Sequence, residues 1–172
     1  MGSLLMRRPD LAELPAAPAA IEVASPADAD GLGRLLTAAF GEPWDPDRVR
    51  RDLLDDPTVS ATFLIRDGDL IVATASARTV PEKHPGAGYL HWVAADPEAR
   101  GRGIGRAVVL AVLHRFAADG CDTSVLETDD HRLAAIKLYL RLGYVPQYPE
   151  PDHQQRWSAI FRLLLGSGSE PR

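Results

Sequence analysis

Hydrophobic and polar residues along this chain follow two periods, which separate predicted helices from predicted strands. Apolar residues recur at every third or fourth position in the segments 26–40 and 46–54, as they do on one face of a helix. A capping residue precedes each segment and a proline opens it, in the pairs Ser25-Pro26 and Asp45-Pro46. We therefore predict a first helix that ends near residue 40 and a shorter one that ends near residue 54.

The rest of the domain alternates between the two periods. β-branched residues are frequent in 59–66 and 69–79, and the Asp67-Gly68 pair between them predicts a tight hairpin. Helices are also predicted at 104–118 and 132–142, and strands at 21–24, 88–95, 123–128, 144–147 and 157–165. This order predicts an α/β fold, with one mixed, mostly antiparallel sheet in a single domain and helices on both faces.

The two ends of the chain differ from its middle. Residues 1–20 are rich in proline and alanine and have no periodicity, so we expect a flexible lead-in. Residues 21–165 contain every predicted element and form the domain. Residues 166–172 follow the last apolar run, and we expect a flexible tail.

Composition argues against several classes of protein. The chain has 172 residues and a formal net charge of −5, which argues against nucleic acid as its main partner. A single cysteine excludes an intrachain disulfide, and no long apolar run predicts a membrane span, so we expect a cytoplasmic protein with no membrane partner. The five histidines form no close ligand pattern, so we expect no metal site.

The segment 89–106 is the centre of the predicted chemistry. An apolar run that ends at Ala95 is followed by Asp96-Pro97, a loop of arginine and glycine, and a helical pattern that begins at Ile104. Glycines allow the backbone to approach a ligand closely, and the first N–H groups of a helix have no partners within it. A helix start of this kind binds anions, most often phosphate.

Spacing separates three kinds of phosphate-binding loop. A dinucleotide fingerprint, Gly-x-Gly-x-x-Gly, needs glycine where Arg106 or Val108 stands, and a nucleotide-triphosphate loop needs Gly-Lys-Ser/Thr, which is not present. The run Arg100-Gly101-Arg102-Gly103-Ile104-Gly105 fits the pattern Arg/Gln-x-x-Gly-x-Gly/Ala. It resembles the acyl-coenzyme A site of the GNAT N-acetyltransferase superfamily.

A second segment, 126–144, resembles the other half of a GNAT enzyme. The family pattern is Asn-x-x-Ala-hydrophobic-x-x-Tyr on a helix, followed by Gly-Phe or Gly-Tyr. Ala135-Ile136, Tyr139 and Gly143-Tyr144 match this pattern. Arg132 stands at the Asn position, which in relatives contacts the pantetheine arm, so this contact is either replaced or lost. The resemblance spans about 21–165, although only 89–144 carries specific motifs.

The resemblance implies an acyl-CoA N-acyltransferase fold and the direct transfer of an acetyl group from acetyl-CoA to an amine. A backbone N–H at the strand end, where this strand splays from its neighbour, would stabilise the oxyanion. The residues implied to hold the coenzyme are Val93, Ala94, Ala95, Arg100, Gly101, Arg102, Gly103, Ile104, Gly105 and Arg106.

Two catalytic side chains are also implied. Tyr139 stands where the family has a tyrosine that serves the departing thiolate, although a core position beside Tyr144 is an alternative. Full proton transfer from a phenol of pKa about 10 to a thiolate of pKa about 8.5 is uphill, so we expect a strong hydrogen bond or a depressed tyrosine pKa. Glu127 stands where some relatives carry a glutamate base, and His91 or a water molecule are alternatives.

The acceptor amine has no recognisable code in the sequence. We expect 40–57 and 146–156 to form the walls of the acceptor site. Acidic residues near these walls predict a cationic amine. These residues are Glu42, Asp45, Asp47, Asp55 and Asp56, with Glu127, Asp129 and Asp130 before the helix of the second motif. We expect a small molecule rather than a protein, because the proline-rich late loop would narrow a peptide groove, and we expect a monomer or homodimer. The alternative function is a non-catalytic acyl-CoA-binding or regulatory module of the same fold.

Overall fold

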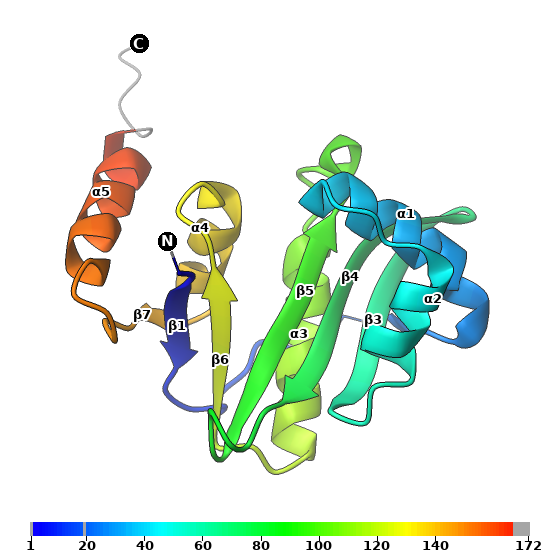
Figure 1. Ribbon diagram of the computed structural model, residues 1–172, viewed down its shortest axis with the longest axis horizontal. Coiled ribbons are helices and arrows are strands. Elements are labelled where there is room, and N and C mark those ends of the chain that lie inside the picture. Colours follow the sequence, from blue (N-terminus) through cyan, green and yellow to red (C-terminus); the bar gives the residue numbers. More distant parts are fainter. Residues whose placement is uncertain (1, 19, 167–172) are drawn as a thin grey trace. The chain divides into compact units, whose positions relative to one another are not determined.

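The computed structural model describes residues 2–18 and 20–166 (Figure 1). Its strands are β1 (Leu4–Arg8), β2 (Glu22–Val23), β3 (Val59–Asp67), β4 (Leu70–Thr79), β5 (Ala87–Ala95), β6 (Thr123–Thr128) and β7 (Val145–Pro146). Its α-helices are α1 (Ala29–Phe40), α2 (Pro46–Val49), α3 (Ile104–Ala118), α4 (Leu133–Arg141) and α5 (His153–Gly166). Short 3₁₀ turns lie at Pro26–Asp28 and Pro97–Ala99, and a π-helical turn at Arg50–Leu54 continues α2.

The chain divides into two compact units. The larger unit is Asp10–Ser124, and the smaller unit combines Met1–Pro9 with Val125–Arg172. We describe each unit by itself.

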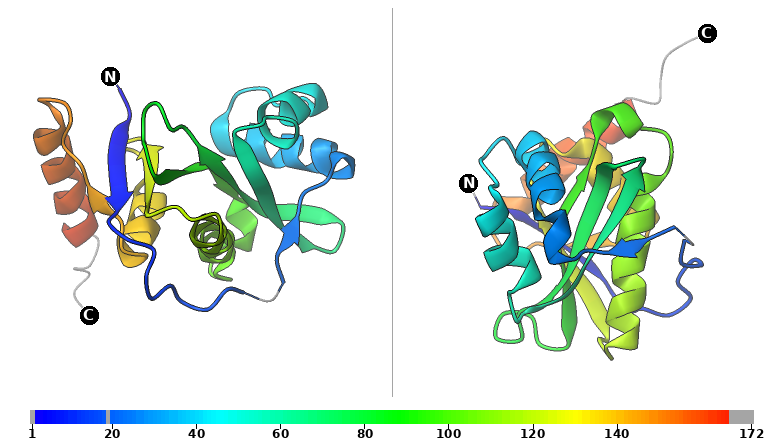
Figure 2. Two further views of the ribbon diagram at one scale, coloured as in Figure 1. Left: turned by 90° about the horizontal axis from the view of Figure 1, so that it is seen from below. Right: turned by 90° about the vertical axis from the view of Figure 1, so that its right-hand side faces the viewer.

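The larger unit is an antiparallel sheet with helices on both faces. Its strands follow the order β2-β3-β4-β5, and each neighbouring pair is antiparallel. The predicted hairpin is confirmed, because β3 and β4 pair up to Asp67 and Leu70 on either side of the turn. Helices α1 and α2 cover one face of this sheet and α3 covers the other (Figures 1 and 2). These features confirm the predicted α/β class.

Both helical layers of the larger unit are anchored by apolar side chains. The layer under α1 and α2 is one buried cluster, which includes Leu32, Leu36, Trp44, Val49 and Leu64. On the other face, α3 buries a nearly continuous apolar stretch that ends at Phe116. A Cβ at Gly88 of β5 would lie 2.3 Å from the Phe116 ring, so only glycine allows this close approach of strand and helix.

The single cysteine, Cys121, lies between α3 and β6 and is partly buried. Burial raises the pKa of its thiol, and the carboxylates of Asp119 and Asp122 raise it further.

The smaller unit brings together segments from both ends of the chain. Its strands follow the order β6-β1-β7, and β1 pairs antiparallel with β7. Leu4 and Met6 of β1 are fully buried, and Arg8 donates from Nε to the carbonyl of Leu142 at 2.8 Å. Residues 1–20 were expected to be a flexible lead-in, but Leu4–Arg8 forms a strand because its alternate apolar side chains are buried.

The segment 157–165 was predicted as a strand, and this prediction is wrong. It lies in α5, where Trp157 and Ile160 are buried one helical turn apart, with His153 one turn before them. Of the predicted tail 166–172, Gly166 ends α5 and the other residues lie outside the described part of the chain.

Candidate active site

Strand β5 contains a bulge shortly before it ends. Ser76 of β4 pairs with His91, and Thr74 pairs with Ala94, so two residues of β5 oppose the single residue Ala75 of β4. A bulge of this kind takes backbone groups out of the strand ladder and bends the strand. Pairing with β4 resumes at Ala94 and Ala95, so the splayed strand end expected for the oxyanion site stays a prediction.

The two residues in the bulge are Trp92 and Val93. Trp92 has a φ of 48°, which lies in the left-handed region. A residue with a Cβ pays about 1–2 kcal/mol for this conformation, so the surrounding structure has to enforce it. The N–H groups at 93–95 follow directly, and their use as oxyanion and pantetheine donors stays a prediction.

The glycine loop joins β5 to α3. Asp96 caps the 3₁₀ turn by accepting a hydrogen bond from the backbone of Glu98 at 2.9 Å. Gly101 and Gly103 then adopt φ values of 80° and 70°, and a Cβ at either would meet no atom within 4 Å. These glycines are therefore required by backbone conformation and not by packing within the described structure.

The loop ends in the N-terminus of α3. Gly103 is the capping residue and makes no side-chain cap, so the first helical N–H groups keep their capacity to bind an anion. Arg102 pairs with Asp67 of the β3–β4 turn at 2.7 Å, while Arg100 and Arg106 are exposed. Ile104 and Gly105 lie in the first turn of α3 and are partly buried.

Both predicted catalytic side chains belong to the smaller unit. Glu127 lies on β6 and is partly buried. Tyr139 lies on α4 and is only 6% exposed, with its ring 5.9 Å from that of Tyr144 in an edge-on arrangement. Burial raises the pKa of Tyr139 to about 12, and the charge of Arg132 offsets part of this rise. The alternative of a depressed tyrosine pKa is therefore wrong in this structure.

Arg132, at the family's Asn position, is the residue that precedes α4. Its Nε lies 3.5 Å from the carboxylate of Asp129. The next carboxylate, Asp130, is bound by Arg156 of α5 through both Nε and Nη2, and these hydrogen bonds lower the pKa of Asp130. Asp129 and Asp130 are thus each paired with an arginine.

Comparison with known proteins decides the family. Residues 29–144 match the family described as Acetyltransferase (GNAT) family. The chain belongs to this family. GNAT acetyltransferases use acetyl-CoA as co-substrate.

Individual relatives agree with this assignment. Mycothiol acetyltransferase of Nocardia farcinica is 31% identical over an alignment of 138 positions, which covers 73% of this chain and 44% of that protein. A GNAT-family acetyltransferase of Colwellia psychrerythraea superposes with a TM-score of 0.68 at 19% identity, over 85% of this chain and 53% of that one. The ribosomal-protein-S18-alanine N-acetyltransferase of Escherichia coli superposes with a TM-score of 0.60 at 23% identity, over 72% and 75%. The chain spans less than half the length of the curated relatives that it matches first.

Four of the five carboxylates that we expected near the acceptor walls of this GNAT chain at 42–56 have a local ion-pair or hydrogen-bond partner. The partners are Arg48 for Glu42, the backbone N–H of Arg48 for Asp45, Arg50 for Asp47, and Thr58 for Asp56. Only two of these partners are cationic, and the segment 42–56 carries six carboxylates against three arginines, so it remains net negative. The expected preference for a cationic acceptor therefore stays a prediction.

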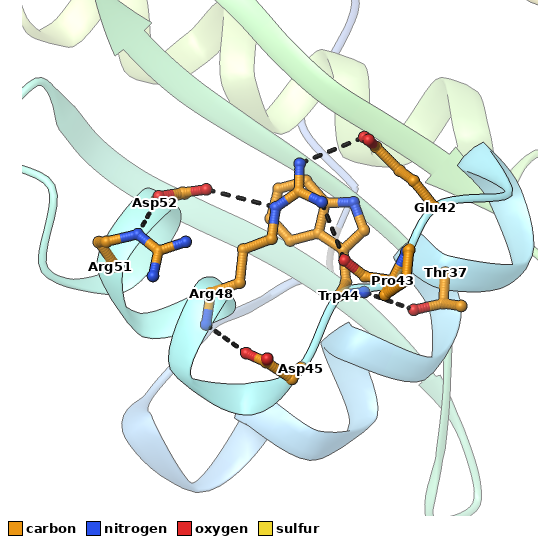
Figure 3. Close-up of polar contacts among 8 residues, drawn as sticks. All are labelled: Thr37, Glu42, Pro43, Trp44, Asp45, Arg48, Arg51 and Asp52. Carbon is orange, nitrogen blue, oxygen red and sulfur yellow. Dashed lines mark hydrogen bonds and ion pairs between the residues drawn. The ribbon is translucent and has the colours of Figure 1, made fainter.

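The sequence analysis missed a cluster of aromatic rings beside the bulge. Trp44 and Trp92 pack edge to face at 4.7 Å, and Arg48 lies over the Trp44 ring (Figure 3). Two of the three tryptophans of the chain meet here, but their separation in sequence gave no sign of the contact.

Two absences apply to the described part of the chain. Within residues 2–18 and 20–166, no helix is long and apolar enough to cross a membrane. Among the same residues, no three His, Cys, Asp or Glu side chains are grouped as metal ligands would be.

Proposed function

We propose that this chain is an acetyl-CoA-dependent N-acetyltransferase that moves the acetyl group directly from the thioester to an amine. One observation supports this most strongly. In the larger unit, a strand bulge, a loop with two glycines of positive φ and the N-terminus of α3 follow one another without interruption. Acyl transfer from coenzyme A needs backbone donors near the thioester and an anion site for the pyrophosphate, in that order along the coenzyme.

The larger unit supplies the coenzyme contacts in this proposal. The N–H groups at the start of α3 bind the pyrophosphate, and Gly101 and Gly103 bring the backbone close to it. Arg100 and Arg106 add positive charge from exposed positions. A backbone N–H at 93–95 donates to the carbonyl oxygen as it becomes an oxyanion, and one such donor contributes about 3 kcal/mol.

Two side chains carry the proton chemistry in this proposal. Tyr139, with its pKa raised by burial, keeps its proton and donates a hydrogen bond to the departing thiolate. Glu127 accepts the proton of the amine, directly or through water, and His91 beside the bulge is the alternative base.

The proposed acceptor is the amine of a small molecule. Several relatives carry the name mycothiol acetyltransferase, whereas the Escherichia coli relative is named for a ribosomal protein. Both kinds of acceptor therefore occur among similar proteins, and the more similar sequences bear the small-molecule name. Because the chain spans less than half of those sequences, the acceptor is tested with a panel of both kinds.

A pair of glycine variants tests the coenzyme site. Gly103 and Gly120 have φ values of 70° and 80°, and a Cβ at either meets nothing within 4 Å, so Gly103→Val and Gly120→Val carry a similar backbone cost. Gly120 lies at the opposite end of α3. We expect Gly103→Val to weaken acetyl-CoA binding about 10- to 100-fold in calorimetry, as for the loss of one or two hydrogen bonds to a charged group, and Gly120→Val to leave it unchanged. Equal coenzyme affinity in both variants would contradict the proposed site.

The alternative function is a GNAT-fold module that binds acyl-CoA without turnover. It predicts normal calorimetric binding with no release of coenzyme A thiol across the acceptor panel. Thiol release that depends on one acceptor and saturates with its concentration excludes this alternative.

A further inference from the structure

We infer that Arg48 is a positioning residue, which acts through Trp44 to hold Trp92 in the left-handed conformation that forms the β5 bulge. Its effect on turnover rests on the proposed function, whereas its effect on the backbone does not. All of the residues involved belong to the larger unit.

The guanidinium of Arg48 is held on every side. Its Cζ lies 3.8 Å from the centroid of the Trp44 ring, and its side chain is 23% exposed. Its three nitrogens donate to the Pro43 carbonyl at 2.9 Å, to Glu42 at 3.2 Å and to Asp52 at 3.4 Å (Figure 3). A planar fork with several donors satisfies this geometry, and a lysine ammonium does not. Each of the three nitrogens of Arg48 thus has a partner within the same segment, as expected of a residue that braces this structure.

Trp44 is the residue that this brace holds in place. Its backbone N–H donates to Oγ1 of Thr37 on α1 at 2.9 Å, and its ring is 3% exposed. Arg48 covers its ring, and Trp92 packs edge-on against it with centroids 4.7 Å apart. Its position is thus determined from both α1 and α2.

Trp92 is surrounded by rings. Besides Trp44, it contacts Phe40 of α1 edge-on at 5.1 Å and stacks with its neighbour His91 at 4.7 Å. Adjacent residues of a regular strand point to opposite faces of the sheet, so stacking between His91 and Trp92 requires the bulge. The ring contacts and the left-handed backbone of Trp92 therefore support each other, and loss of the contacts removes the reason for the unusual conformation.

The consequence for chemistry follows from chain order. The donors proposed for the oxyanion come directly after Trp92. If Trp92 relaxes to ordinary strand geometry, the bulge disappears and side chains beyond it change faces. Arg48 thus acts on the reaction through the backbone.

Replacement of Arg48 by methionine tests this inference against a matched control. Arg48→Met keeps an unbranched side chain about as far as the position of Nε and removes the guanidinium fork. Arg51→Met removes an arginine of the adjoining π-helical turn that is 68% exposed and pairs with Asp52. We expect Arg48→Met to lower kcat by about 10- to 100-fold, as for a misplacement of catalytic groups, and Arg51→Met to leave kcat within about twofold.

Position 92 provides the decisive comparison. Trp92→Gly and Trp92→Ala both remove the ring, but glycine adopts a positive φ without penalty. We expect Trp92→Gly to keep at least about fivefold more activity than Trp92→Ala, the reverse of the usual order in a strand. In the Trp92→Gly background, Arg48→Met should change kcat by less than about twofold, because the brace no longer has a strained residue to hold.

Amide hydrogen exchange at 92–94 separates the effect of Arg48 on the backbone from its effect on turnover. Arg48→Met should change the exchange rates of these amides at least about tenfold while the rest of β5 keeps its protection, and Arg51→Met should not. Unchanged amide exchange in Arg48→Met would overturn the inference. So would a loss of kcat from Arg48→Met that is as large in the Trp92→Gly background as in the wild-type background. A wild-type chain that neither binds nor turns over acetyl-CoA would instead defeat the proposed function, and the exchange result would still decide the role of Arg48.

Discussion

Replacement of Tyr139 by phenylalanine removes a single hydroxyl from the smaller unit. Burial raises the pKa of this phenol to about 12. The departing thiolate of coenzyme A has a pKa near 8.5, so complete transfer of the tyrosine proton would be uphill by about 3.5 pKa units, or about 5 kcal/mol. In the proposed reaction we therefore expect the phenol to remain protonated and to act as a hydrogen-bond donor.

The size of the expected effect follows from this role. A neutral donor to a charged acceptor contributes about 1.5–3 kcal/mol, which corresponds to a fall in kcat of about 10- to 150-fold in Tyr139→Phe. The sulfur of acetyl-CoA carries no charge before transfer, so the affinity for the coenzyme should change by less than about threefold. Tyr144→Phe is the matched control, because this ring is also buried and packs against Tyr139.

The assay measures the release of coenzyme A thiol, with the coenzyme affinity measured by calorimetry. Between about pH 6 and pH 10, the pH dependence of kcat should contain no ionisation of Tyr139, either in the wild type or in the variants. Normal kcat in Tyr139→Phe would refute the role of the hydroxyl. A wild-type limb near pH 8–9 that disappears in Tyr139→Phe would refute the argument that the phenol stays protonated.

Stability at alkaline pH tests the same pKa without reference to catalysis. Above about pH 10 an unfolded chain loses the Tyr139 proton, whereas the folded chain keeps it until about pH 12. The contribution of this residue to folding is therefore lost as the pH rises from about 10 to about 12. Urea unfolding of Tyr139→Phe should show less alkaline destabilisation than wild type over this range, and parallel curves would contradict the assignment.

Two further predictions concern stability. Gly88→Ala places a Cβ 2.3 Å from the Phe116 ring and should lower the free energy of unfolding in urea by about 1–3 kcal/mol. Phe116→Leu should restore part of this loss. A neutral effect of Gly88→Ala would show that β5 and α3 are not closely packed. The hydrogen bond from Arg156 lowers the pKa of Asp130, so stability from this carboxylate is present above its unfolded pKa near 4 and is lost as the pH falls through the lower folded value. Asp130→Asn should therefore flatten the fall in Tm between pH 5 and pH 2.5, and an unchanged slope would contradict this.

Local signals in the sequence predicted the elements of the larger unit well. The Asp67-Gly68 hairpin is confirmed because the turn chemistry and the two strands that it joins are adjacent in sequence. The glycine loop is confirmed in its conformation, since Gly101 and Gly103 adopt the positive φ that glycine tolerates. The α/β class followed from the order of these elements.

The errors lie where long-range contacts decide the structure. Strand β1 pairs with β7, more than a hundred residues away, so the short apolar alternation at Leu4–Arg8 had no visible partner in the sequence. In α5, aromatic and aliphatic residues suggested a strand, although Trp157, Ile160 and Leu164 are spaced as on one helix face.

The bulge at Trp92 could not be predicted from the sequence for a different reason. A positive φ is anticipated at glycine, and nothing in the local sequence marks a tryptophan for it. The cause is tertiary, because rings from α1 and from the segment before α2 surround this side chain. The most informative residue of the candidate site was therefore the one with no local signature.

The raised pKa of Cys121 has a practical consequence for thiol chemistry on this protein. A thiol that stays protonated at neutral pH reacts slowly with aromatic disulfides and with maleimides, because the thiolate is the nucleophile. Cys121 is the only cysteine in the sequence. Free coenzyme A should therefore react with a colorimetric disulfide reagent well before the protein does. Once acetyl transfer is complete, the same side chain can be alkylated at higher pH to attach one probe per chain.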